Sequence, residues 1–318
     1  VCGRLVDEGY GVWGLDNFDS YYDPAIKRRN LEQVAANPCM HLVEGDIRDE
    51  VLLEGLFSSV PFDLVIHLAA RAGVRPSLAQ PELCWDVNVI GTMRLLETMR
   101  RHHVQRLVFA SSSSVYGERT PDGGAFTESD PACHPVSPYA ASKRSGELLC
   151  HTWHHLWGLS VHCLRFFTVY GPRQRPDLAI NKFARLMREG MPIPVYGDGS
   201  SSRDYTHVAD VVEGVVRSAE VLGDLPPNEP AFRILNLGHG RGVSLEALIE
   251  ALADALDVRP RISREPDQPG DVPLTLADTT ELEAVLGFRP RVDFADGIRS
   301  FVEWQAEVGA AGETVATG

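Results

Sequence analysis

The sequence lacks any apolar run close to the roughly 20 residues that span a bilayer, and nothing at its start resembles a signal peptide. Positive charge is also scarce, because 30 lysines and arginines stand against 44 aspartates and glutamates, a formal net charge of -14. An acidic surface repels nucleic acid and anionic membranes, so neither is expected as a partner. An anionic ligand would have to be held by a local group of arginines and backbone amides.

Cysteine pairs with C-x-x-C spacing are missing as well. The chain has six cysteines, which are scattered along it and lie mostly in apolar surroundings. This pattern is typical of reduced thiols in a cytoplasmic protein. No metal site is expected.

Strand-like and helical patterns alternate through the first half of the 318 residues. The opening stretch predicts a helix that ends at Gly9. The run D-L-V-I-H-L-A-A at 63–70 is typical of a parallel strand covered on both faces. Further strands are expected at 11–15, 41–44, 106–111 and 159–166, and helices at 24–36, 49–57, 82–102 and 139–158. This alternation predicts an α/β fold with a doubly wound parallel sheet.

Beyond residue 172 strands and helices alternate less regularly, and the strand-like pieces become short. Helices are expected at 180–189, 208–221, 244–256 and 296–308, and strands at 193–196, 233–237 and 261–262. The sequence therefore predicts a doubly wound domain at 1–171 and a smaller, mainly substrate-covering α/β domain at 172–308. The low-complexity tail at 309–318 is expected to be disordered.

Tyr139 and Lys143 stand four residues apart in the string S-P-Y-A-A-S-K, and Pro138 suits the start of a helix. Two side chains with this spacing share one helix face. An ammonium beside a phenol lowers a pKa that is otherwise about 10, which makes the tyrosine a usable general base. Y-x-x-x-K alone occurs often by chance, so the interpretation depends on what surrounds it.

Polar residues recur at the expected carboxyl ends of the strands, the edge at which open α/β sheets bind ligands. Ser111 to Ser114 follow one strand directly, and a hydroxyl there would orient a substrate alcohol. Asp16 ends another strand, where a carboxylate binds ribose hydroxyls and repels a 2′-phosphate, favouring NAD over NADP. Asp46 ends the next strand and Ile47 would face the adenine, while small Ala69 and Ala70 let the cofactor approach the backbone.

Many ordered motifs give this sequence a specific resemblance. They are L-D-N-F, G-D-I-R-D, H-L-A-A-R-A-G-V-R, N-V-I-G-T, S-S-S-S-V-Y-G, S-P-Y-A-A-S-K, R-F-F-T-V-Y-G-P, R-D-Y-T-H-V-A-D and Q-P-G-D-V. From Val1 to about Phe301 the chain resembles an extended short-chain dehydrogenase/reductase, in the branch of nucleotide-sugar epimerases and dehydratases. The resemblance implies a Rossmann-like NAD-binding domain at 1–171, a UDP-sugar substrate and a homodimer.

The resemblance also implies the site residues. Ser112, Tyr139 and Lys143 would be catalytic. Dehydratases of this family place an Asp-Glu pair at the two positions that are Ser113 and Ser114 here, so the implied reaction is epimerisation. The implied cofactor-binding residues are Asp16, Asn17, Asp46, Ile47, Leu68, Ala69, Ala70, Asn88, Ser111, Tyr139, Lys143 and Phe167, and the implied substrate-binding residues are Arg75, Ser112, Ser113, Thr168, Arg175, Arg203 and Asp271.

Two segments bear on the sugar. A-G-V-R-P-S at 72–77 and T-V-Y-G-P-R-Q-R-P-D-L-A at 168–179 resemble UDP-glucuronate 4-epimerases. UDP-glucose 4-epimerases typically have Asn in place of Thr168. Arg175 and Arg75 would suit a sugar carboxylate, which a guanidinium binds bidentately, and without such a partner they would be poorly compensated. They would alternatively serve the diphosphate.

One departure matters, because the family's first strand and its Gly-rich, pyrophosphate-binding turn should precede Val1. We expect either a fragment of a longer protein or a weakened affinity for NAD, and favour the fragment. The leading hypothesis is a UDP-glucuronate 4-epimerase that oxidises and re-reduces C4 with tightly bound NAD. The alternatives are a UDP-glucose/galactose 4-epimerase and a non-catalytic nucleotide-sugar-binding relative.

Overall fold

The computed structural model describes residues 1–119, 123–197, 199, 201–226, 228–266 and 273–315, without the side chains of 309–315. Strands and helices alternate through its first part, as the sequence predicts. The first elements are α1 (Cys2–Asp7), β1 (Val12–Asp16), α2 (Pro24–Ala35), β2 (Met40–Glu44), α3 (Glu50–Ser59) and β3 (Val65–His67).

The first helix ends at the expected glycine. Gly9 has a φ of 90°, its N–H donates to the Val6 carbonyl, and the N–H of Tyr10 reaches back to Leu5 O at 3.0 Å. These two hydrogen bonds, together with the left-handed conformation of Gly9, form a Schellman motif. It terminates α1 at Asp7, and the chain enters the sheet at Val12 after a short turn.

One sheet is formed by the parallel strands β1 and β2, and a larger parallel sheet has the order β3-β4-β5-β9. The added strands are β4 (Arg106–Ser112), β5 (Ser160–Phe166) and β9 (Phe232–Leu237). The register places Ser111 beside Arg165 and Ser112 beside Phe166. The strand expected at 233–237 therefore belongs to this sheet, beside β5, and not to the smaller part of the chain.

Helices cover both faces of the larger sheet, which confirms the doubly wound fold. Leu107 and Phe109 pack on one face with α6 (Gly91–Arg101) and α7 (Pro138–Trp157). Val108, between them in β4, packs on the other face with α9 (Val208–Asp224) and α11 (Thr280–Leu286). The two faces of β4 are thus separately buried, as expected for a continuous apolar strand.

Two elements differ from the sequence-based expectation. The strand expected at 63–70 is shorter, because β3 ends at His67 and the Leu68 side chain is exposed. The helix expected at 82–102 is divided into α5 (Pro81–Trp85), a π-helical turn η1 (Asp86–Ile90) and α6. A π turn inserts an extra residue into a helix and is frequent at functional sites. Here it contains Asn88.

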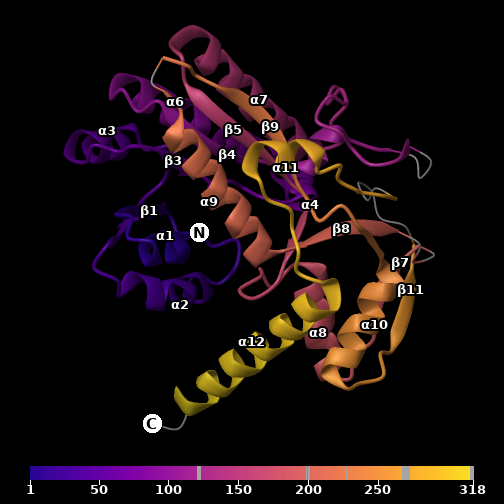
Figure 1. Cartoon of the computed structure of the whole chain (residues 1–318). Helices are drawn as coiled ribbons and strands as arrows, with labels where there is room; N and C mark the ends of the chain where they lie inside the picture. Colours follow the sequence, from indigo (N-terminus) through magenta and orange to yellow (C-terminus); the bar gives the residue numbers. More distant parts are fainter. Residues whose placement is uncertain (120–122, 198, 200, 227, 267–272, 316–318) are drawn as a thin grey trace.

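The later elements enclose a second core around Phe183, Leu252 and Phe301. β8 (Ser202–His207) pairs in parallel with β6 (Thr168–Tyr170) and antiparallel with β10 (Gly242–Ser244), and β7 (Ile193–Tyr196) pairs with β11 (Ile262–Glu265). Figure 1 shows α8 (Ala179–Arg188), α10 (Leu245–Leu256) and α12 (Phe294–Val315) gathered at the opposite end of the molecule from α7.

The proposed domain boundaries and the disordered tail stay predictions, although α12 continues past its expected end into that tail. No helix among the described residues has both the length and the apolar character needed to cross a bilayer.

Candidate active site

Ser112 and Tyr139 meet where β4 ends and α7 begins. Ser112 is the last residue of β4, and its hydroxyl caps the short 3-10 helix η2 (Ser113–Tyr116), accepting from Ser114 N at 3.2 Å. The start of α7 is fixed by Ser137, which caps Ala140 N, and by Ser77, whose hydroxyl accepts from Tyr139 N at 3.1 Å. These caps bring the Ser112 hydroxyl, which donates to Ser114 Oγ at 3.1 Å, near enough to the Tyr139 phenol to act on its pKa.

The pKa of Tyr139 is raised by burial, while the Ser112 hydrogen bond and the charge of Arg175 act to lower it. The sequence-based prediction that Lys143 lowers this pKa is wrong for this structure. The Lys143 ammonium donates instead to the Ala110 carbonyl at 2.7 Å. A buried ammonium takes the nearest acceptor, and the strand carbonyl supplies one.

Lys143 is almost completely buried between α7 and the sheet. Its Nζ lies 5.3 Å from the centre of the Phe109 ring. Burial lowers the pKa of Lys143 to about 8, whereas Cys84, Cys150 and Glu147 act to raise it. Lys143 therefore changes charge within the range at which enzymes of neutral pH operate.

Asn88 connects the π turn to both sides of the site. Its Oδ1 accepts from the backbone N–H of Arg71 at 2.7 Å, and its Nδ2 donates to the Ser142 hydroxyl of α7 at 2.9 Å. Its carbonyl accepts from Thr92, whose hydroxyl also contacts His67 Nε2 at 2.9 Å. Asn88 thus holds the loop after β3 against α7.

The carboxyl ends of β1 and β2 carry the expected polar residues side by side. Asp16 is exposed, and one of its oxygens accepts from Phe18 N at 2.7 Å. Asn17 donates to Asp46 Oδ2 at 2.9 Å. Hydrogen bonds from Arg48 are the main reason that the pKa of Asp46 lies well below its usual value. Asp46 is therefore committed to neighbouring side chains, whereas Asp16 keeps an exposed carboxylate.

The remaining expected cofactor residues differ in how accessible they are. Ile47 and Phe167 are buried, Ala69 and Ala70 are partly buried, and Leu68 is exposed. The Ser111 hydroxyl faces away from this edge and donates to Glu147 Oε1 at 2.6 Å.

Arg175 has a carboxylate partner within the chain, so its charge is compensated without a sugar carboxylate, contrary to the expectation. Its Nε and Nη2 bind the two oxygens of Asp177 at 3.0 and 2.9 Å, and its Nη1 donates to Ala72 O at 3.1 Å. Tyr21 joins the cluster by donating to Asp177 at 3.1 Å. Arg175 consequently ties the loop after β3 to the loop after β6.

The other expected substrate residues lie on separate elements. Ser113 and Thr168 are partly buried, and Thr168 begins β6. Arg75 lies over the Tyr196 ring at 5.4 Å. Arg203 lies on β8 and donates to Ser202 O at 3.0 Å. Asp271 lies outside the described residues.

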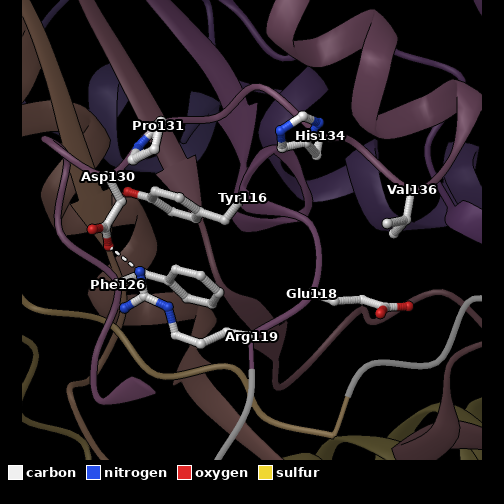
Figure 2. A pocket seen from close by; sticks show the side chains of 8 residues that line it. All are labelled: Tyr116, Glu118, Arg119, Phe126, Asp130, Pro131, His134 and Val136. Atoms are coloured by element: carbon white, nitrogen blue, oxygen red, sulfur yellow. Dashed lines mark hydrogen bonds and ion pairs between the residues drawn. The ribbon is translucent and has the colours of Figure 1, made fainter. Parts of the chain in front are cut away.

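A cavity of about 340 Å³ lies beyond the η2 turn. Figure 2 shows its lining, in which Arg119 pairs with Asp130 at 2.6 Å and Phe126 stacks on Tyr116. The described residues that line it include neither Ser112 nor Tyr139. We therefore place the candidate active site at the β4–α7 junction and not in this cavity.

Several residues around the site were not predicted from the sequence. Arg71 contacts Asn88 through its backbone, Ser77 fixes the backbone of Tyr139, and Asp177 occupies the fork of Arg175. Glu147 and Arg165 form a buried pair beneath Lys143. Glu147 carried a usable sequence signal, because it follows Lys143 at the same four-residue spacing that links Lys143 to Tyr139.

Comparison with known proteins places this geometry in context. Residues 1–238 match the NAD dependent epimerase/dehydratase family. The UDP-glucuronate 4-epimerase of Thermodesulfobacterium geofontis is 36% identical over 304 residues, covering 95% of this chain and 91% of that protein.

Solved structures agree in fold. The UDP-glucuronic acid 4-epimerase of Bacillus cereus, in complex with UDP-glucuronic acid and NAD, matches with a TM-score of 0.88 and 30% identity, over 96% of this chain and 95% of that one. The UDP-glucose 4-epimerase of Thermotoga maritima with UDP-glucose matches with a TM-score of 0.85 and 30% identity, over 96% and 94% of the two chains.

Proposed function

The chain belongs to the NAD-dependent epimerase/dehydratase family, and on that premise we propose that it interconverts UDP-glucuronate and UDP-galacturonate. The observation that carries the proposal is the proximity of Ser112, at the end of β4, to Tyr139, which lies one helical turn before the buried Lys143. This is the arrangement that proton removal from a sugar hydroxyl requires, and a relative named UDP-glucuronate 4-epimerase aligns along nearly the whole chain.

Tyr139 is the proposed general base, with its phenolic oxygen taking the proton of the sugar 4-hydroxyl. Ser112 orients that hydroxyl by hydrogen bonding. The raised pKa of Tyr139 means that the positive charge of Arg175 is needed to make the phenolate accessible. The same phenol returns the proton when the 4-keto sugar is reduced on its other face.

The residues at the sheet edge fit NAD. The exposed carboxylate of Asp16 matches two ribose hydroxyls and opposes a 2′-phosphate, and the partly buried Ala69 and Ala70 leave the backbone approachable. Ile47 and Phe167 supply apolar surface. Bound NAD would supply the acceptor and donor of the C4 hydride, so the reaction needs no external oxidant.

Two features favour epimerisation of a uronic acid. Ser113 and Ser114 supply no carboxylic acid of the kind that eliminates water in dehydratases. A 4-keto uronic acid is a β-keto acid and tends to lose carbon dioxide, so the site must hold its carboxylate. Thr168 and Arg175 are the proposed ligands of that carboxylate, with Arg75 and Arg203 left to the sugar edge and the diphosphate.

A homodimer is also proposed, on the basis of an apolar outer face on neighbouring helices. Trp85 and Met93 are exposed on the helix that includes the π turn, and Leu148 and Leu156 are exposed on α7. Sedimentation velocity would measure this assembly. The six free cysteines support the proposed cytoplasmic location.

The function is tested by incubating the protein with UDP-glucuronate and NAD and separating the products by chromatography. UDP-galacturonate is the expected product. Conversion of UDP-glucose at a comparable rate would instead identify the UDP-glucose/galactose 4-epimerase, whose fold matches almost as well. Binding of both sugars without turnover would identify a non-catalytic relative.

A further inference from the structure

Glu147 is a fully buried carboxylate next to the catalytic pair. It follows Tyr139 and Lys143 on α7 at spacings of four residues, so the three side chains share one face of the helix. Arg165 binds it bidentately, with Nε on Oε1 and Nη2 on Oε2, both at 2.8 Å. Neither side chain is accessible to solvent beyond a trace.

The same carboxylate also holds the end of the strand that carries Ser112. Ser111 Oγ donates to Glu147 Oε1 at 2.6 Å, and Lys143 Nζ donates to Ala110 O at 2.7 Å. Two consecutive residues of β4 are thus bound by two consecutive turns of α7. This double contact sets the distance between the hydroxyl of Ser112 and that of Tyr139, which are carried by the two elements.

Glu147 is ionised in the fold. Burial acts to raise its pKa, but hydrogen bonds and charge from Arg165, with further bonds from Ser111 and Arg144, hold that pKa below its usual value. A buried ion pair is a costly way to obtain stability, because desolvation offsets most of the attraction. Stability alone therefore does not explain why this buried ion pair is present.

The groups around Lys143 show how the negative charge of Glu147 affects the Lys143 ammonium. Cys84 faces it from α5, His67 from β3, and Cys150 and Glu147 from its own helix. His67 stays neutral, because burial and the Lys143 charge lower its pKa to about 3. The Cys84 thiol also stays neutral, because burial raises its pKa. Glu147 is consequently the ionised acid that favours the ammonium form of Lys143.

We propose that Glu147, fixed by Arg165, is a positioning residue of the active site that clamps β4 to α7 and maintains the charge of Lys143. This rests on the proposed function, in which Ser112, Tyr139 and Lys143 act on the substrate. Glu147 itself touches none of the reacting atoms.

The first test is the Glu147→Gln variant, assayed with UDP-glucuronate at saturating NAD. The expected result is a kcat lowered on the order of 10- to 100-fold, the effect of small misplacements in an active site, with little change in KM. The alkaline limb of the pH profile should move to lower pH, because loss of the carboxylate lets Lys143 lose its proton earlier. Ser111→Ala keeps every charge, so it should lower kcat without moving that limb.

The second test needs no turnover. The chain contains only three lysines, Lys27, Lys143 and Lys182, so lysine labelled with 13C at Cε gives three NMR signals to titrate. Loss of one signal in Lys143→Met assigns it. The pKa of Lys143 should fall measurably in Glu147→Gln and stay unchanged in Ser111→Ala.

Glu97→Gln is the matched control, since Glu97 pairs with Arg100 on the surface of α6 and should change neither measurement. Wild-type kcat and an unmoved Lys143 titration in Glu147→Gln would overturn the proposal. The proposal would also be overturned if the kcat fell only in proportion to the loss of folded protein, measured by circular dichroism, and the Lys143 titration did not move. If Glu147→Gln does not fold, an unchanged kcat in Ser111→Ala overturns the clamp. A wild-type protein inactive on UDP-glucuronate refutes the proposed function instead, while the lysine titration still decides the role of Glu147.

Discussion

Removing the Arg175 guanidinium should reduce the preference for UDP-glucuronate over UDP-glucose, but by less than the loss of an unpaired arginine would. The structure gives the reason, because Asp177 already occupies the Nε and Nη2 positions that a sugar carboxylate would take. A substrate that binds there bidentately must first displace Asp177.

The magnitude follows from these two competing carboxylates. A charge-assisted bidentate contact with the substrate contributes about 1.5–3 kcal/mol. Arg175 and Asp177 keep side-chain exposures of 23% and 36%, so solvent screens their pairing and breaking it costs about 0.5–1 kcal/mol. The net selection is about 0.5–2.5 kcal/mol, which corresponds to roughly two- to sixtyfold in favour of UDP-glucuronate.

Titration calorimetry with UDP-glucuronate, UDP-glucose and UDP measures this selection. Arg175→Ala should abolish it and leave the affinity for UDP almost unchanged. Asp177→Asn removes the competitor and should increase the selection by about two- to fivefold. Arg185→Ala is the control, because Arg185 pairs with Glu189 on the surface of α8. Equal weakening of all three ligands by Arg175→Ala would refute the reasoning and make Arg175 a diphosphate ligand.

The remaining predictions concern the base, the cofactor and the stability of the fold. Tyr139→Phe should lower turnover by about two to four orders of magnitude with UDP-glucuronate binding retained, while exposed Tyr10→Phe should have no effect; near-normal turnover in Tyr139→Phe would end the assignment. Lys143→Met should lower kcat, because the end of β4 loses the hydrogen bond from Lys143 Nζ to Ala110 O that holds it against α7; an unchanged kcat would contradict a role for Lys143. Asp16 should make NAD raise the melting temperature more than NADP does, and equal shifts from the two cofactors would contradict its role. Burial lowers the pKa of His162 to about 4. Below pH 6.5 the unfolded chain therefore binds a proton at His162 that the folded chain does not. The free energy of unfolding should consequently fall by up to about 1.4 kcal/mol per pH unit between pH 6.5 and pH 4. Urea unfolding at pH 7 and pH 5 should show a smaller difference in His162→Asn than in the wild type.

Most of the sheet was predictable because its strands are apolar runs bounded by polar turns. Both faces of β4 are covered, so its middle residues, Leu107 to Ala110, had to be apolar. The place of β9 was not predictable in the same way. Its own sequence predicts a strand, but its partner β5 lies far away along the chain, and local pattern carries no information about such pairing.

The identity of the catalytic residues was predictable, while their electrostatics were not. Tyr139 and Lys143 follow from one helical spacing, and Ser112 from its place after a buried strand. The direction of the Lys143 side chain depends on which acceptor is nearest, and the acceptor is a carbonyl of β4. The raised pKa of Tyr139 likewise depends on burial by residues from other elements. Neither quantity is encoded in the helix that carries the residues.

A stricter use of periodicity would have located Glu147 and Arg165. Glu147 lies on the face of α7 that turns toward the sheet, and Arg165 lies at a strand position whose neighbours on both sides, Leu164 and Ser111, are buried. A charge at a position that the pattern assigns to the core must be paired, because an isolated buried charge is prohibitively costly. With one acidic and one basic residue in such positions on adjacent elements, their pairing follows before any coordinates are known. The presence of that pair directly beneath the catalytic lysine, where an apolar pair would fill the same space at lower cost, is the reason to assign it to the chemistry and not to the packing.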